Sequence, residues 1–153
     1  MDNKFRFGQV LKSKELMKRE LPLQLANQAQ NFFVKSWSDQ GWDGEKWKEV
    51  KRRISGTPEF KYPKFRDLGR RTRAIMVGSI YNKRGSHLRN QVSKSIQTVS
   101  FPLIRLVVNS PYAERHNEGL GGMPRRRFMG QTVKLTGMQK ATIEKAIDKI
   151  FKR

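Results

Sequence analysis

The sequence predicts an α+β fold in which a small antiparallel sheet packs with an N-terminal helix and a C-terminal helix, with a long basic loop between them. Apolar residues recur at helical spacing in residues 8–38 and again in residues 137–152, which predicts the two helices. A β-rich run over residues 103–108 follows a weakly alternating segment over residues 91–100, which predicts the sheet. The chain has 153 residues, so we expect a single domain over 1–153.

The N-terminal helix is expected over residues 8–38, with a break at Pro22. A proline has no amide hydrogen with which to continue a helix, but it is well suited to begin one. After Pro22, apolar side chains recur every three or four positions and therefore share one face: Leu25, Ala29, Phe32, Phe33 and Trp37. We interpret this aromatic face as a core-packing surface rather than a ligand site.

A long irregular segment is expected over residues 38–73, because glycine and proline interrupt every regular element there. Lys and Arg far outnumber Asp and Glu in residues 44–73, and aromatic residues lie among them. This mixture can bind a nucleic-acid strand through phosphate contacts and base stacking, or its aromatic side chains can pack back onto the core. We expect residues 44–85 to be loop-rich or partly disordered, and both interpretations stay open. The candidate DNA-facing residues are Lys51, Arg52, Arg53, Lys61, Lys64, Arg70 and Arg71.

The second half of the chain begins with a short apolar run over residues 74–81, which is compatible with a helical turn or a strand. We expect residues 91–100 and 103–108 to form an antiparallel pair, with a hairpin turn at Phe101-Pro102. The C-terminal helix is expected over about 137–152, begun by a capping-box pattern at Thr136 and Gln139.

Residues 109–130 lie between the strands and the last helix, and they are the most informative stretch of the sequence. Asn109-Ser110-Pro111 is a cap-like lead into a short helix expected from Tyr112 to Glu118, which Gly119 ends. The glycine-rich run 119–122 lacks the Lys-Ser/Thr pair of a phosphate-binding loop. We interpret it as a flexible hinge, where positive φ angles are allowed.

The formal net charge of +20 favours anionic partners, such as DNA, RNA, an anionic membrane surface or an acidic protein ring. Composition does not choose among them. The chain has no cysteine, which excludes disulfides and thiolate metal sites. No run approaches the roughly 20 apolar residues of a membrane helix, and the first residues lack the apolar core of a signal peptide. We therefore expect a soluble protein without a cleaved signal.

Catalytic groups are scarce. The two histidines are His87 and His116, and only Glu114 and Glu118 lie close to His116 in sequence. A metal site needs more ligands at helical or hairpin spacing. His116 follows Tyr112 by four residues, on the same helical face, so packing or hydrogen bonding is its simpler role. We expect no enzymatic activity, cofactor or metal; a nuclease-like activity would need His116 to act with one of the two glutamates.

Residues 109–130 also carry a family resemblance. They join Tyr-Ala-x-x-His-x-x-Gly to a glycine-rich gap and then to Met-Pro-Arg-x-Arg-Phe-Met-Gly. This order resembles the signature of phage virion morphogenesis proteins, the tail-completion family of P2-like and Mu-like phages, which typically have Ile-Pro-Ala-Arg-Pro-Phe-Leu-Gly after the gap. Arg125 and Arg127 replace the alanine and the second proline, which makes the turn less rigid and adds charge. The matching positions are Tyr112, His116, Gly119, Pro124, Arg126, Phe128 and Gly130.

Two looser phrases are similar to the same family. The phrase from Asp39 to Trp47 resembles its glutamine and Gly-x-x-Trp phrase, in which the tryptophan is a packing anchor, so core packing is favoured for Trp47. The phrase from Gly85 to Asn90 is similar to one that leads into the first strand. The resemblance also implies that Phe128 is buried and that Arg126 bonds backbone carbonyls or an acidic neighbour.

The resemblance implies a non-enzymatic structural protein of a phage or prophage, which completes the tail and contributes to head–tail joining as a subunit of a homo-oligomeric ring. Its partners would be tail and head–neck proteins, with non-specific DNA contact in the ring lumen. It would reside in the virion, and in the bacterial host cytoplasm during assembly. The charge and the basic loop support an alternative function, that of a sequence-independent nucleic-acid-binding protein.

Overall fold

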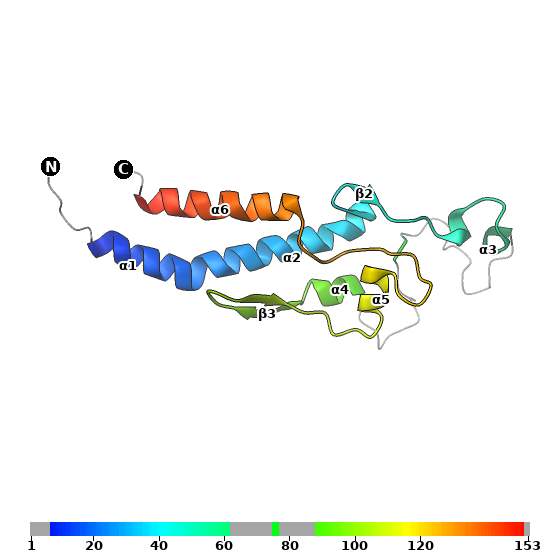
Figure 1. Cartoon of the computed structure of the whole chain (residues 1–153), viewed down its shortest axis with the longest axis horizontal. Coiled ribbons are helices and arrows are strands. Elements are labelled where there is room, and N and C mark those ends of the chain that lie inside the picture. The colour runs from blue at the N-terminus through cyan, green and yellow to red at the C-terminus, as the bar shows by residue number, and fades with distance from the viewer. Residues whose placement is uncertain (1–6, 62–74, 77–87, 152–153) are drawn as a thin grey trace. The chain divides into compact units, whose positions relative to one another are not determined.

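The computed structural model describes residues 7–61, 75–76 and 88–151 (Figure 1). It confirms the α+β class, because helices occur together with two antiparallel strand pairs. The chain divides into two compact units: unit 1 comprises residues 1–32, 92–107 and 131–153, and unit 2 comprises residues 33–91 and 108–130. Each unit combines segments that are distant in sequence, so this division alone does not define separate domains, and the single domain stays a prediction.

The N-terminal helical path has three parts: α1 (Phe7–Glu15), a π-helical segment (Leu16–Glu20) and α2 (Leu21–Asp39). The predicted break near Pro22 is therefore a change of helix type, and the helical path continues through it. Pro22 cannot donate to the carbonyl four residues earlier, and its ring would clash there. A wider π turn relieves this conflict, with the Leu21 amide donating to the Leu16 carbonyl.

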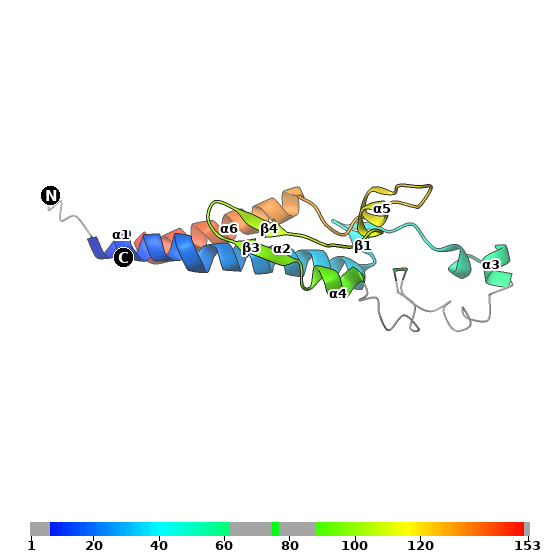
Figure 2. The same cartoon turned by 90° about the horizontal axis from the view of Figure 1, so that it is seen from below.

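Unit 1 is layered around this helical path. Helix α6 (Val133–Phe151) runs alongside α1 and the first part of α2, and the hairpin of β3 (Ile96–Val99) and β4 (Ile104–Leu106) lies on the other side of α2 (Figures 1 and 2). Gln28 donates to the Met138 carbonyl at 3.3 Å, whereas Gln9 donates to the Ile150 carbonyl at 3.4 Å. Since the residue numbers run in opposite senses, α6 is antiparallel to the N-terminal path.

The predicted hairpin is confirmed. β3 and β4 pair antiparallel, with Val99 opposite Ile104 and Ile96 opposite Leu106. The register shifts between Ile96 and Thr98, which leaves an extra residue on β3 as in a β-bulge. The Ser100 amide donates to the Leu103 carbonyl at 3.1 Å and closes the turn over Phe101-Pro102.

The buried face of α2 is shifted from the predicted one. Ala26 and Ala29 are buried in unit 1, and Phe33 and Trp37 are buried in unit 2. Leu25 and Phe32, predicted for the core, are only half-buried. The spacing therefore predicted the helix and the burial of Ala29, Phe33 and Trp37 correctly, but it missed Ala26, which is fully buried.

Helix α6 begins four residues earlier than predicted, and the capping box at Thr136 and Gln139 is wrong. The Leu135 amide donates to the Thr132 hydroxyl at 3.0 Å, so Thr132 caps the helix. Thr136 lies inside α6, where its hydroxyl donates to the Thr132 carbonyl at 2.9 Å. The earlier start brings Leu135, which is 1% exposed, onto the buried face.

In unit 2 the predicted irregular segment contains short regular elements. A small hairpin of β1 (Gly41–Trp42) and β2 (Glu45–Lys46) is followed by a 3₁₀ turn (Lys51–Arg53) and by α3 (Pro58–Lys61). The described part of the phrase over residues 85–90 lies in a short helix, α4 (Leu88–Val92), which precedes β3. The strand expected from residue 91 therefore begins only at Ile96. The 74–81 run lies mostly outside the described residues. Within the described part of the chain, no helix has the length and apolar character needed to cross a membrane.

The burial of Leu135 gives a stability prediction. Leu135→Ala should lower the free energy of unfolding by about 2–5 kcal/mol, because a buried leucine loses its packing and leaves a cavity. Leu103→Ala, at a position that is 48% exposed in the same unit, is the matched control and should cost far less. Urea unfolding followed by circular dichroism measures both. Equal losses in the two variants would contradict the assigned core.

Candidate functional site

The motif of residues 109–130 forms a closed loop within unit 2. Helix α5 (Ala113–Glu118) is followed by a glycine-rich turn, and an extended return segment, residues 123–129, runs back beside the helix. The Arg126 amide donates to the His116 carbonyl at 2.7 Å, which joins the return segment to the last turn of α5. The two halves of the motif therefore make one structural element.

Gly119 ends α5 as predicted. Its φ of 77° is left-handed, and its amide donates to the Arg115 carbonyl at 2.9 Å. A Cβ atom at this position would lie 3.0 Å from the backbone nitrogen of Arg125. Glycine is therefore required both by the backbone angle and by the close passage of the return segment.

The predicted cap at the start of α5 is wrong. Tyr112 is the N-cap residue, and no side chain of the described residues caps this end. Ser110 contributes its backbone instead, because its carbonyl accepts from the Ala113 amide at 3.0 Å.

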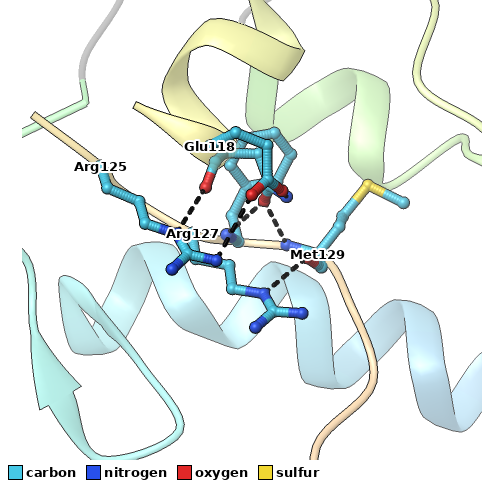
Figure 3. Close-up of polar contacts among 6 residues, drawn as sticks. Glu118, Arg125, Arg127 and Met129 are labelled. Carbon is cyan, nitrogen blue, oxygen red and sulfur yellow. Dashed lines mark hydrogen bonds and ion pairs between the residues drawn. The ribbon is translucent and has the colours of Figure 1, made fainter. Parts of the chain in front are cut away.

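Asn117 holds the end of the return segment. Its side-chain carbonyl accepts from the Phe128 amide at 3.0 Å and from the Met129 amide at 3.1 Å. The contacts around the loop are shown in Figure 3, where Arg125 reaches Glu118 at 3.3 Å and the Arg127 guanidinium reaches the Met129 carbonyl at 3.3 Å. Nothing in the sequence indicates that Asn117 holds the return segment, because its partners are backbone amides and these do not depend on residue type.

Phe128 anchors the return segment from inside. It is 1% exposed, which confirms its expected burial, and its ring centre lies 4.9 Å from that of Trp37. Trp37 in turn meets Trp47 edge-on at 5.9 Å. The Trp47 indole donates to the Arg127 carbonyl at 2.7 Å, so Trp47 is a packing anchor that also fixes the return segment.

The contacts of Trp42 help to decide whether the aromatic residues near the basic loop pack onto the protein or stack on bases. Its ring lies 5.9 Å from the Phe33 ring, and the Arg127 guanidinium lies 5.5 Å from its centre. These contacts use the indole within unit 2 through stacking and a cation–π interaction. For Trp42 and Trp47 the structure supports packing onto the unit rather than stacking on bases.

Arg126 is a nearly buried cation, with 7% of its surface exposed. Its Nη2 donates to the Lys48 carbonyl at 3.2 Å, which confirms the expected bond to backbone. Its Nε is buried and has no hydrogen-bond partner in the described part of unit 2. Burial lowers the pKa of the Arg126 guanidinium, and the charge of Arg52 adds to this, whereas Glu49 raises the pKa.

His116 packs beside this cation. Its ring meets the Tyr112 ring edge-on at 6.2 Å, in agreement with their predicted common face. Its Nδ1 is buried, with no hydrogen-bond partner in the described structure. Burial lowers the pKa of His116, and the positive charge of Arg126 lowers it further. Among the described residues, no group of His, Asp and Glu could hold a metal ion.

The remaining motif residues are Pro124 and Gly130. Pro124 and Gly130 are half-buried at either end of the return segment, and Gly130 has a φ of 144°. The glycine-rich turn also has the expected backbone, since Gly121 and Gly122 have φ angles of 65° and 74°.

Of the candidate DNA-facing residues, the structure places three on one turn and a fourth on a separate helix. Lys51, Arg52 and Arg53 share the 3₁₀ turn, and Lys61 ends α3. Arg53 bonds Glu49 at 3.4 Å and Gln40 at 3.2 Å, and Arg52 donates to the Ile75 carbonyl at 3.5 Å. Lys51 is exposed and pairs with Glu59 at 3.7 Å. Lys64, Arg70 and Arg71 lie outside the described residues.

Comparisons with known proteins add no relative: no protein-family model, curated protein or solved structure matches this chain.

The two bonds to Asn117 give a second prediction. Asn117→Ala should lower the free energy of unfolding by about 1–3 kcal/mol, because two backbone amides lose their acceptor. Asn109→Ala removes an exposed asparagine from the same unit and serves as the control, with most of the stability retained. Amide hydrogen exchange at Phe128 and Met129 should accelerate in the Asn117 variant only. Unchanged exchange there would contradict the role of Asn117.

The lowered pKa of His116 gives a third prediction. The unfolded state binds a proton near the ordinary pKa of 6.5, whereas the folded state resists it. Stability from this group is therefore complete above pH 6.5 and is lost as the pH falls below that value. Urea unfolding between about pH 7.5 and pH 5.5 should show this loss, and His116→Gln should reduce it. His87→Gln leaves the His116 side chain in place and should retain its contribution; an equal pH dependence in the parent and in His116→Gln would contradict the assignment.

Proposed function

We propose that this chain is a non-enzymatic structural protein of phage or prophage virion assembly, which completes the tail and contributes to head–tail joining as a ring subunit. The proposed partners are tail and head–neck proteins, with the virion as the final location and the bacterial cytoplasm as the place of assembly. The observation that carries the proposal is the closed loop of residues 109–130. The residues that resemble the tail-completion signature are also those that build this loop.

Three of the matching positions have a physical role consistent with such a signature. Gly119 ends α5 where a side chain would collide with the return segment, and Phe128 fills the interior of unit 2. Arg126 bonds the Lys48 backbone. These contacts support the resemblance, because they give a reason why those residue types recur at that spacing in one folded element.

The loop also indicates which motif residues a neighbouring subunit can touch. Phe128 and Arg126 are buried, so they shape the loop from inside. Tyr112 is 40% exposed and Leu120 is 45% exposed, so the α5 side of the loop offers apolar surface. In a closed ring each subunit meets one neighbour through one patch and the other neighbour through a different patch, and we place Tyr112 in one of these two patches.

A second candidate function is sequence-independent nucleic-acid binding. The net charge of +20 favours it, as do the exposed Lys51 and Lys61. It predicts that a monomer binds duplex DNA and that its affinity falls steeply with salt. The ring proposal instead requires self-association without DNA.

Solution mass distinguishes the two functions. We expect light scattering of the purified protein to show a multimer that persists at low and high salt without short duplex DNA. Tails that lack their completion protein should then join heads when the protein is added. A protein that stays monomeric and fails to join tails to heads would overturn the proposal.

A charge comparison tests the DNA alternative in the same experiment. The double variant Lys51→Gln/Lys61→Gln should keep the multimer, since the proposed contact is apolar. If the alternative function holds, this variant should weaken DNA binding more than Lys140→Gln/Lys145→Gln. The control removes the same charge from exposed positions on α6.

A further inference from the structure

The turn of the β3–β4 hairpin exposes apolar side chains. Phe101 is 63% exposed and Leu103 is 48% exposed, and Pro102 between them is also exposed. The Ser100 amide donates to the Leu103 carbonyl at 3.1 Å, so the turn is closed and holds Phe101 outward. Turns that face water ordinarily carry polar residues. Residues 101–103 therefore form an unusual apolar surface, here called the hairpin tip.

A second apolar surface lies on the pair of helices α1 and α6. The Gln9 side chain donates to the Ile150 carbonyl at 3.4 Å, so the antiparallel helices touch at these two residues. Seen from one end, an antiparallel pair turns in opposite senses, so the residue that follows each contacting residue points to the same side of the pair. Val10 and Phe151 therefore share one side, and Ile147 lies one turn before Phe151 on that side.

These three side chains are all exposed. Val10 is 50% exposed, Ile147 is 43% exposed and Phe151 is 53% exposed. They are here called the helix-pair patch. Like the hairpin tip, this patch contains one phenylalanine that is more than half exposed, and aromatic side chains supply much of the energy of protein interfaces.

Both surfaces belong to unit 1, whose own core is small. Among its described residues, the buried large apolar side chains are those of Leu21, Val92 and Leu135. Unit 1 thus exposes apolar groups that an ordinary core would enclose. Interfaces between subunits that fold together resemble a domain core cut in half, so contact with another protein surface would complete this packing.

The charges near the two surfaces indicate that a second copy can occupy them. Residues 95–104 contain no charged residue, although 30% of the chain is charged. Beside the helix-pair patch, Lys140 pairs with Glu144 at 3.9 Å, and Glu144 precedes Ile147 by three residues. Lys14, four residues after Val10, adds a positive charge at the edge of the patch. An uncharged hairpin tip can approach this edge without bringing like charges together, so a net charge of +20 does not oppose the contact.

The two surfaces also satisfy the geometry of a ring. They are made by different elements, since the hairpin lies on the other side of α2 from α6 (Figures 1 and 2). A closed ring needs two different patches on each subunit, one for each neighbour, whereas a single self-complementary patch gives a two-fold dimer. The hairpin tip and the helix-pair patch provide two such patches within one unit.

We propose that the hairpin tip of one copy docks onto the helix-pair patch of the next copy, where Phe101 packs against Ile147 and Phe151. This inference rests on the proposed ring and names the part of its subunit contact that unit 1 contributes. Tyr112, which belongs to unit 2, is a separate part of the contacts between neighbours.

Matched variants of the full chain test each surface. Phe101→Ser removes the anchor of the hairpin tip, and Ile147→Ser/Phe151→Ser removes the helix-pair patch. Each should raise the protein concentration at half-assembly at least about tenfold, which corresponds to about 1.4 kcal/mol. Val133→Ser/Met138→Ser removes exposed apolar side chains nearer the start of α6 and should leave assembly unchanged. Light scattering over a range of concentrations measures assembly, and circular dichroism checks that each variant is folded.

Mixing the two variants tests whether the hairpin tip meets the helix-pair patch. The Phe101→Ser chain keeps its helix-pair patch, and the Ile147→Ser/Phe151→Ser chain keeps its hairpin tip, so one contact stays possible between them. We expect a 1:1 heterodimer in the mixture, at concentrations where each variant alone is monomeric. A contact between two identical surfaces would leave one variant able to self-associate, and the mixture would contain no new species.

The outcomes separate this contact from the proposed function. A multimeric parent whose assembly resists both variants, or responds equally to the Val133/Met138 control, would overturn the contact and leave the ring proposal standing, as would a mixture without a heterodimer. A parent that is monomeric at every concentration would overturn both. A heterodimer from a protein that does not join tails to heads would keep the contact and remove the function. Phe101-dependent binding to phosphatidylcholine–phosphatidylserine vesicles, with unchanged multimer mass, would assign the hairpin tip to a membrane surface and overturn the proposal.

Discussion

The packing of Phe128 against Trp37 is the contact on which the architecture of unit 2 depends. A buried aromatic ring supplies much apolar area, and its position on the return segment fixes where that segment runs. With Phe128 in place, Asn117 can accept from two successive amides, and the Trp47 indole can reach the Arg127 carbonyl. These polar bonds are directional, and the buried Phe128 ring holds the return segment where their geometry is met.

Helix α2 serves two units with two kinds of side chain. In unit 1 its buried residues include the small Ala26 and Ala29. In unit 2 its buried residues include Phe33 and Trp37, which fill space around the closed loop. One helix can contribute to the core of both units because its first part belongs to unit 1 and its last part belongs to unit 2. The change from alanine to aromatic residues occurs near the point where the chain passes from one unit to the other.

Patterns of neighbouring residues predicted the helix, turn and helix end that depend on interactions between residues close in sequence. The aromatic spacing in α2 predicted a helix, the Phe101-Pro102 pair predicted a turn, and Gly119 predicted a helix end. The helix cap of α6 and the role of Asn117 were not predicted from such local patterns. Thr132 caps α6 in place of Thr136, and the Asn117 side chain accepts from two amides of the return segment, 11 and 12 positions further along the chain. The resemblance implied the burial of Phe128, which is 1% exposed, but residue type alone did not indicate that Arg126 would be buried or that Tyr112 would be 40% exposed.

The distribution of basic side chains bears on how a charge of +20 can act. Arg126 and Arg127 donate to backbone carbonyls in unit 2, and Arg53 bonds Gln40 and Glu49. A carbonyl does not cancel a positive charge, so the long-range attraction for anions remains. Yet a buried guanidinium whose N–H groups already donate to backbone carbonyls has little freedom to bind a phosphate. The charge therefore attracts anionic partners more than it defines a nucleic-acid contact, and specificity must come from exposed surface of suitable shape.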